Sequence, residues 1–329
     1  MPKRKFPTAT TEPAHRVADA AAPALRRALA DALGATIGAH LTLPLLAEAI
    51  RTQRSYQVAS GPAWLAFTNA LYLSLQEVLG PLFVRSANLA SDALPTPTAK
   101  ALPPASVGVR FDLTNPAAVA YARRYAAELV LDLSATSKDA IRAILSRVLN
   151  GEMTAESAAR LIRASIGLTP RQVASLERFR NELRDTGIPD ARADALAERY
   201  GRTQLASRAS AIARTESMRA ANAGQQAAWE QGVADGYIPV GGVRRRFITA
   251  ADELVCPICQ PVDGVLATIE GDFPAGDPPL HVNCRCVVGL VYANDDGTFT
   301  ERAPREAPPL LPGARRQTTR SLRPRVPAA

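Results

Sequence analysis

The feature that most constrains this chain is a cluster of soft metal-binding side chains near its C-terminal end. All four cysteines of the 329 residues stand at positions 256, 259, 284 and 286, and a histidine stands at position 281. The two residues between Cys256 and Cys259 let both thiolates turn toward one cation, and His281 with Cys284 repeats this spacing. The spacing predicts a structural zinc site formed by Cys256, Cys259, His281 and Cys284, with Cys286 as the alternative ligand.

Two other interpretations of the cysteines remain open. Reduced cysteines are among the most buried residue types, so these four could simply fill a small core. They could also form disulfides if the protein is part of a particle that later leaves the cell.

Short strands are predicted around the cluster. Three segments have the β-branched and apolar composition of strands: residues 244–249, 265–269 and 287–292. Asp263-Gly264, which precedes the second segment, is a typical hairpin turn. We therefore expect a small β-rich module around the cysteines.

The rest of the chain favours helix. Only 5% of the residues are aromatic and alanine is abundant, a composition that suits helices packed closely through small side chains. Four helix start signals are present, at Asn115-Pro116, Ser137, Thr154 and Thr169-Pro170. These helices are predicted to form an antiparallel array, and a longer helix is expected from about Gln204 to Gln231.

The predicted fold class is therefore mainly α, with a helical N-terminal region and a helical array, followed by a small β-rich Cys/His cap (an α+β C-terminal module). The predicted segments are a basic flexible N-terminus (1–16), an N-terminal helical domain (17–92), a Pro-rich linker (93–115), the helical part of the second domain (116–235), the Cys/His module (236–295) and a disordered basic tail (296–329).

The N-terminal helical domain shows a packing pattern and no motif for chemistry. Breaks are expected near Gly34–Gly38 and at Gly61-Pro62. The stretch from Ser55 to Val84 lacks Lys and Arg, but polar residues interrupt it and its apolar residues recur at helical spacing. We therefore expect one face of a packed helix there and no membrane segment.

A carboxylate falls inside the apolar stripe of the longer helix. Glu216 needs a partner there, because an unpaired buried charge costs several kcal/mol, on the order of the desolvation penalty. One interpretation places Glu216 at a seam, where it pairs with Arg214 or Arg219. Our hypothesis is an ion pair between Glu216 and Arg285, which would tie the helix to the cysteine-rich segment.

The formal net charge of +8 is located at the two ends of the chain. The region between them is formally neutral, which argues against a broad nucleic-acid-binding face on the folded part. The C-terminal tail is rich in proline and arginine, and we expect it to bind DNA weakly through Arg315, Arg316, Arg320, Arg323 and Arg325. A tail that only keeps the protein soluble is the alternative.

Several motifs occur together in an order typical of one family. They are Ile212-Ala213-Arg214-Thr215-Glu216 with Arg219, Ala220 and Asn222, the Cys256-Pro257-Ile258-Cys259 pair, the Asp263-Gly264 turn, and the run from Pro278 to Cys286. In order and spacing these motifs resemble the phage Mu F-like minor head proteins, also called phage head morphogenesis proteins. The resemblance covers about residues 111–295.

This resemblance implies a structural, non-enzymatic minor head protein of a tailed bacteriophage that acts in head morphogenesis. Such a protein is made in the bacterial host cytoplasm and then lies in the virion, in the head interior or at the portal vertex. The implied partners are the phage portal protein, the scaffold or major capsid protein, and phage DNA. No membrane and no small-molecule substrate is implied.

Three other functions compete with this interpretation. A zinc-ribbon-like DNA-binding adaptor would need a basic folded surface, whereas only Arg244 to Arg246 form a local basic run. A metal-dependent nuclease would need a second histidine, and His15 and His40 both lie far from His281 in the sequence. A cysteine hydrolase built on Cys284 is disfavoured because the neighbouring thiols favour metal binding over a free nucleophile.

Overall fold

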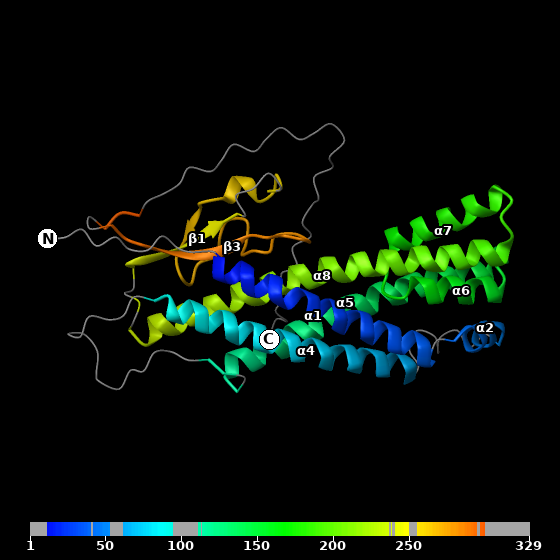
Figure 1. Cartoon of the computed structure of the whole chain (residues 1–329), viewed down its shortest axis with the longest axis horizontal. Coiled ribbons are helices and arrows are strands. Elements are labelled where there is room, and N and C mark those ends of the chain that lie inside the picture. The colour runs from blue at the N-terminus through cyan, green and yellow to red at the C-terminus, as the bar shows by residue number, and fades with distance from the viewer. Residues whose placement is uncertain are drawn as a thin grey trace. The chain divides into compact units, whose positions relative to one another are not determined.

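The computed structural model describes residues 12–40, 42–52, 62–94, 111–112, 114–236, 238, 241–249, 255–294 and 297–299. Its helices are α1 (Glu12–His40), α2 (Leu43–Arg51), α4 (Pro62–Asp92), α5 (Pro116–Leu149), α6 (Ala155–Ser165), α7 (Pro170–Asp185) and α8 (Asp190–Ala234) (Figure 1). Its strands are β1 (Val243–Ile248), β2 (Leu266–Ala267) and β3 (Val287–Tyr292), with a short 3-10 helix at Gln260–Val262. The predicted fold class, mainly helical with a small β-rich Cys/His module, is confirmed.

The chain divides into two compact units that do not follow the order of the sequence. One unit contains residues 1–18, 85–110 and 218–329, and the other contains residues 19–84 and 111–217. Helices α1, α4 and α8 therefore each contribute residues to both units. The domain boundaries predicted from the sequence stay predictions. The linker between residues 95 and 110, the first eleven residues and the tail after residue 299 lie outside the described residues.

Three of the predicted helix starts are confirmed by their caps. Asn115 Oδ1 accepts a hydrogen bond from Ala117 N at 2.9 Å, and Thr154 Oγ1 accepts one from Ser157 N at 3.2 Å. Thr169 and Gln172 form a reciprocal capping box at the start of α7. Each cap satisfies backbone N–H groups that have no partner inside the first helical turn.

The predicted start at Ser137 is wrong, because α5 is one continuous helix from Pro116 to Leu149. Ser137 is buried inside it, where its hydroxyl donates to Leu133 O at 2.8 Å and accepts from Gly167 N at 3.1 Å. Serine satisfies its hydroxyl in this way within a helix as readily as at a helix start.

Two further helix boundaries predicted from the sequence are also wrong. Helix α1 runs through Gly34–Gly38 to His40, so the predicted break there is wrong. Helix α8 begins at Asp190 and includes Gly201, whereas the predicted helix began only at Gln204. A Cβ at Gly201 would lie 2.9 Å from Ala164 O, so this glycine allows α6 and α8 to approach each other closely.

Within the second unit α5, α6, α7 and the first part of α8 lie side by side in an antiparallel array (Figure 1). The array predicted from four helix starts therefore differs in its members, since two of its helices are the single helix α5 and the first part of α8 completes it. Helix α6 packs against α5 and α2, and α7 packs against α5. The apolar stripe predicted in α4 is buried at Trp64, Leu71, Leu75 and Leu79. Among the described residues, no helix combines the length and the apolar character needed to cross a membrane.

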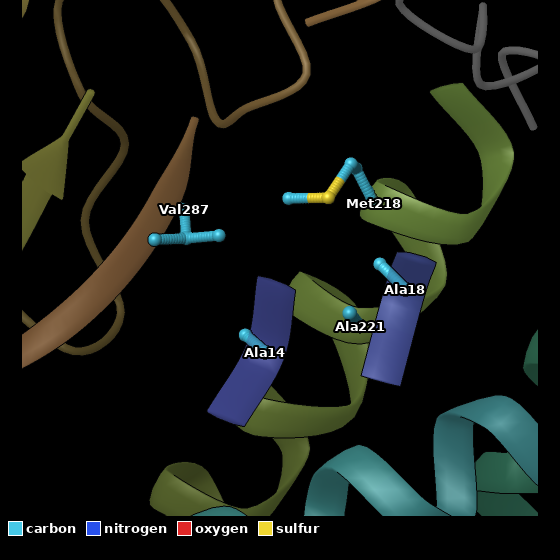
Figure 2. Close-up of a cluster of buried hydrophobic side chains, with 5 residues drawn as sticks. All are labelled: Ala14, Ala18, Met218, Ala221 and Val287. Atoms are coloured by element: carbon cyan, nitrogen blue, oxygen red, sulfur yellow. The ribbon is translucent and has the colours of Figure 1, made fainter. Parts of the chain in front are cut away.

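The first unit contains a three-stranded antiparallel sheet in the order β2-β1-β3. The ends of all three strands lie within two residues of the predicted segments, and β3 matches its segment. Gly264 adopts a φ of +84° in the predicted turn. A small core of alanines with Met218 and Val287 joins the sheet to helices: Ala14 and Ala18 of α1, Met218 and Ala221 of α8, and Val287 of β3 (Figure 2). Small side chains allow both helices to come close to the same strand.

A buried carboxylate connects three helices of the second unit. Asp194 of α8 accepts hydrogen bonds from Arg180 Nε of α7 and Arg160 Nη1 of α6, both at 2.5 Å. Arg180 also donates to Ser157 Oγ at 2.7 Å. Only 6% of each of the Asp194 and Arg180 side chains is exposed. If one partner is removed, water therefore cannot readily solvate the charge of the other.

We expect Asp194→Asn to lower the free energy of unfolding by about 3 kcal/mol, because it leaves the buried Arg180 charge without its counter-charge. Asp190→Asn is the matched control: Asp190 pairs with Arg184 but is 73% exposed, so its loss should cost less than about 1 kcal/mol. Urea denaturation followed by circular dichroism measures both. Equal losses in the two variants would contradict the role assigned to Asp194.

Candidate metal centre

Each pair of predicted ligands is carried by a tight turn. Cys259 N donates to Cys256 O at 3.1 Å, and Cys284 N donates to His281 O at 3.1 Å. In the second turn Asn283 has a φ of 62°, a left-handed conformation that asparagine adopts more easily than most residues. The two turns give the first and last side chain of each segment a common direction.

The five predicted donors come together as two overlapping groups. Cys256, Cys259 and His281 form one group, Cys259, Cys284 and Cys286 form the other, and the ligand atoms within each lie within 4.8 Å of one another. His281 Nε2 lies 2.9 Å from Cys256 Sγ and 3.2 Å from Cys259 Sγ, and Cys259 Sγ lies 3.7 Å from Cys284 Sγ. Cys259 belongs to both groups and is the centre of the cluster.

The imidazole of His281 is oriented by its own turn. Its Nδ1 donates a hydrogen bond to Val282 O at 2.8 Å. With a proton on Nδ1, Nε2 is the ring nitrogen that faces the two sulfurs. A backbone carbonyl often fixes the tautomer of a metal-binding histidine in this manner.

Hydrogen bonding gives the thiols different affinities for protons. Contacts with Cys259, Cys286 and His281 hold the pKa of Cys284 well below its usual range. The Cys284 sulfur in turn raises the pKa of Cys259, and it raises the pKa of His281 to about 9. Negative charge is therefore concentrated on Cys284, which favours a cation beside it.

One donor separation is that expected around a tetrahedral metal ion, although Cys284 does not belong to the group of donors formed by Cys256, Cys259 and His281. Two sulfurs that each lie about 2.3 Å from such an ion are about 3.8 Å apart. The observed separation of 3.7 Å between Cys259 Sγ and Cys284 Sγ is close to this value, and all four cysteines are free thiols. The distances from His281 Nε2 are those of hydrogen bonds and would lengthen by roughly half an ångström around an ion.

Asn222 of α8 holds the backbone that carries Cys286. Its side-chain amide donates to Cys286 O at 3.2 Å and to Pro278 O at 3.3 Å. Its Oδ1 accepts from Val288 N at 3.2 Å, and the side chain is buried. The same amide therefore satisfies three backbone groups on the two segments that flank His281 and Cys284.

A buried arginine supports the other side of the module. Arg245 of β1 is 3% exposed, and its guanidinium donates to Thr268 O at 3.0 Å, to Gln226 Oε1 of α8 at 3.0 Å and to Gly271 O. It pairs with Asp277 at 3.1 Å and stacks over Phe273. Arg245 thus fixes the loop between β2 and the His281 turn.

One residue near the cluster could not be found from the sequence. The His15 ring, through Nε2, hydrogen-bonds to Arg285 O at 2.5 Å, so the first turn of α1 reaches the segment between Cys284 and Cys286. The sequence interpretation placed His15 far from His281, and that distance along the chain was misleading. The one indication of this contact in the sequence is the alanines around His15, because Ala14 and Ala18 pack α1 against β3 (Figure 2).

Two further predicted sites remain predictions. Glu216 is buried, but it belongs to one unit and Arg285 to the other, so their ion pair is not tested. Arg315, Arg316, Arg320, Arg323 and Arg325 lie outside the described residues, as does the side chain of His40.

A helical body with a small antiparallel sheet and a Cys/His cluster defines the structural class of this protein. Residues 147–289 match the family model of the phage Mu protein F like proteins. The chain thus carries a Mu F-like region that begins in the last turn of α5 and ends within β3, which confirms the resemblance predicted from the sequence. Neither a curated protein nor a solved structure is significantly similar to it.

We expect Asn222→Ala to lower the free energy of unfolding by at least about 2 kcal/mol, because Cys286 O and Val288 N would remain buried without a partner. Asn181→Ala, at an exposed position of α7, is the control and should stay within about 0.5 kcal/mol of the wild type. Urea denaturation at fixed metal concentration measures both. An Asn222→Ala protein as stable as its control would show that these hydrogen bonds do not hold the module.

Proposed function

We propose that this protein is a structural minor head protein of a tailed bacteriophage and acts in head morphogenesis. The match of residues 147–289 to the phage Mu protein F like family is the observation that carries the proposal. The cluster supports a structural role, because its donors face one another and His15 is engaged with a backbone carbonyl. The protein would lie in the virion, and we propose no catalytic activity for it.

Its proposed partners follow from this position. The portal protein is the first, and the scaffold or major capsid protein is the second. Phage DNA is a third partner, and the arginines of the tail would contact it weakly and in a salt-dependent way. The proposed location is the head interior or the portal vertex, after synthesis in the host cytoplasm.

We expect the protein to be present in purified mature particles, where mass spectrometry of the particle proteins detects it. Deletion of its gene should leave heads that are defective or fewer in number, while host growth without phage is unchanged. A supply of Asn181→Ala protein should restore head formation, whereas Asn222→Ala protein should restore it less. A protein absent from particles at every stage of assembly would contradict the proposal.

We further propose that the cluster holds one structural zinc ion. Cys256, Cys259, His281 and Cys284 are the favoured ligands, and Cys286 is the alternative to one of them. Bound zinc would link the two turns and stabilise the module, since metal affinity adds directly to folding free energy. The separation of the Cys259 and Cys284 sulfurs supports this proposal.

Purified protein should contain about one zinc per chain, as expected for a tightly bound structural ion. Cys259→Ser should lose most of the metal because Cys259 belongs to both donor groups. If the favoured ligand set is correct, Cys286→Ser should keep its zinc. If Cys286→Ser loses its zinc while Cys256→Ser keeps it, the alternative set that includes Cys286 is the correct one. Atomic emission gives the metal content, and circular dichroism checks that each variant is folded. A wild-type protein with less than about 0.2 zinc per chain would exclude the site.

A further inference from the structure

The neutral charge of the central region conceals a separation of charges around helix α8. Apart from the exposed Asp190, the acids of this helix in the second unit point inward: Asp194 and Glu216 are buried, and the Glu198 side chain is 27% exposed. Asp190, at the first residue, pairs with Arg184 of α7. The arginines at positions 192, 199, 202 and 214 are instead exposed.

These four arginines lie on one face of the helix. At 100° per residue they fall within about 120° of the helix circumference, and they extend over about 33 Å of its length. Among the α8 residues on this face none carries a carboxylate. Arg202 makes one long contact to Glu198 at 3.9 Å, and Arg202 is 71% exposed, so this contact costs little to break.

The exposed residues between the arginines are small or carry hydroxyl groups. Thr203 and Ser210 are exposed on this face, and so are Ala195 and Ala206. Surfaces that bind other proteins usually have a core of aromatic or large aliphatic side chains. Among the α8 residues on this face the one large aliphatic side chain between the arginines is the half-buried Leu196, which does not make such a core, and this disfavours a protein partner.

We propose that this arginine face of α8, defined by Arg192, Arg199, Arg202 and Arg214, binds the phosphate backbone of duplex DNA. Guanidinium groups bind phosphate oxygens through paired N–H donors, and serine and threonine hydroxyls add further donors. The small side chains allow the helix to approach the backbone closely. The length of the face corresponds to about one turn of duplex DNA.

Binding of this kind is independent of base sequence and strongly dependent on salt. Each phosphate contact contributes about 0.9 to the slope of log K against log salt. The arginine face shares no residue with the tail or with the metal centre, and its DNA binding is proposed as a property of the isolated protein. Its test therefore does not depend on the proposed role in the phage head.

The test measures the affinity of four full-length proteins for a short DNA duplex of random sequence. Fluorescence anisotropy gives each affinity over a series of salt concentrations. They are the wild type, a face variant (R192Q, R199Q, R202Q and R214Q), a control with four other exposed helix arginines changed (R26Q, R27Q, R123Q and R142Q), and a tail variant (R315Q, R316Q, R320Q, R323Q and R325Q). Glutamine keeps the helix propensity of arginine and removes its charge. Circular dichroism confirms that each variant is folded.

We expect the face variant to bind DNA at least tenfold more weakly at low salt. The slope of its log K against log salt should be smaller in magnitude than that of the wild type by about 3 to 4. The control should resemble the wild type in both quantities. Equal slopes for the face variant and the control would overturn the proposal, even if the tail variant loses binding. If the face variant loses binding to poly-glutamate but binds duplex DNA like the control, the face recognises an acidic protein segment and the assignment to DNA is wrong.

Discussion

One buried carboxamide determines where the cysteine-bearing backbone lies on helix α8. Asn222 uses both ends of its amide, two donors to Cys286 O and Pro278 O and one acceptor for Val288 N. Partial loss of such a set leaves buried polar groups unpaired, so the three hydrogen bonds form together or not at all. The positions of Cys284 and Cys286, and of the strand that follows them, depend on this contact.

Local signals in the sequence predicted the parts of the fold that local interactions determine. The caps at Asn115, Thr154 and Thr169 were identified because a cap bonds to its own first turn. Ser137 gave the same signal inside a helix, where its hydroxyl bonds to a carbonyl one turn back. The helix predicted to begin at about Gln204 begins at Asp190 instead, and it includes Gly201, whose missing side chain allows the close approach of α6.

In the candidate site, too, the local features could be predicted from the sequence and the distant contacts could not. The spacing of Cys256, Cys259, His281 and Cys284 is local, and it identified the donors that the two turns bring together. The contacts that hold these turns in place could not be predicted, since Asn222, Arg245 and His15 bond to segments distant in the sequence. Asn222 was noticed only as a member of the family motif, without its partners. The arginine face was hidden for another reason: a count of charges along the chain does not show which of them face the solvent.

The interleaving of the two units has a practical consequence for dissecting this protein. Ala14 and Ala18 belong to the same small core as Met218 and Val287 (Figure 2). A fragment cut at residues 147 and 289 would contain every cysteine and the histidine of the cluster, yet it would expose the apolar surface that the beginning of the chain covers. Such a fragment is prone to aggregation, and an expression tag placed just before α1 lies close to the same core.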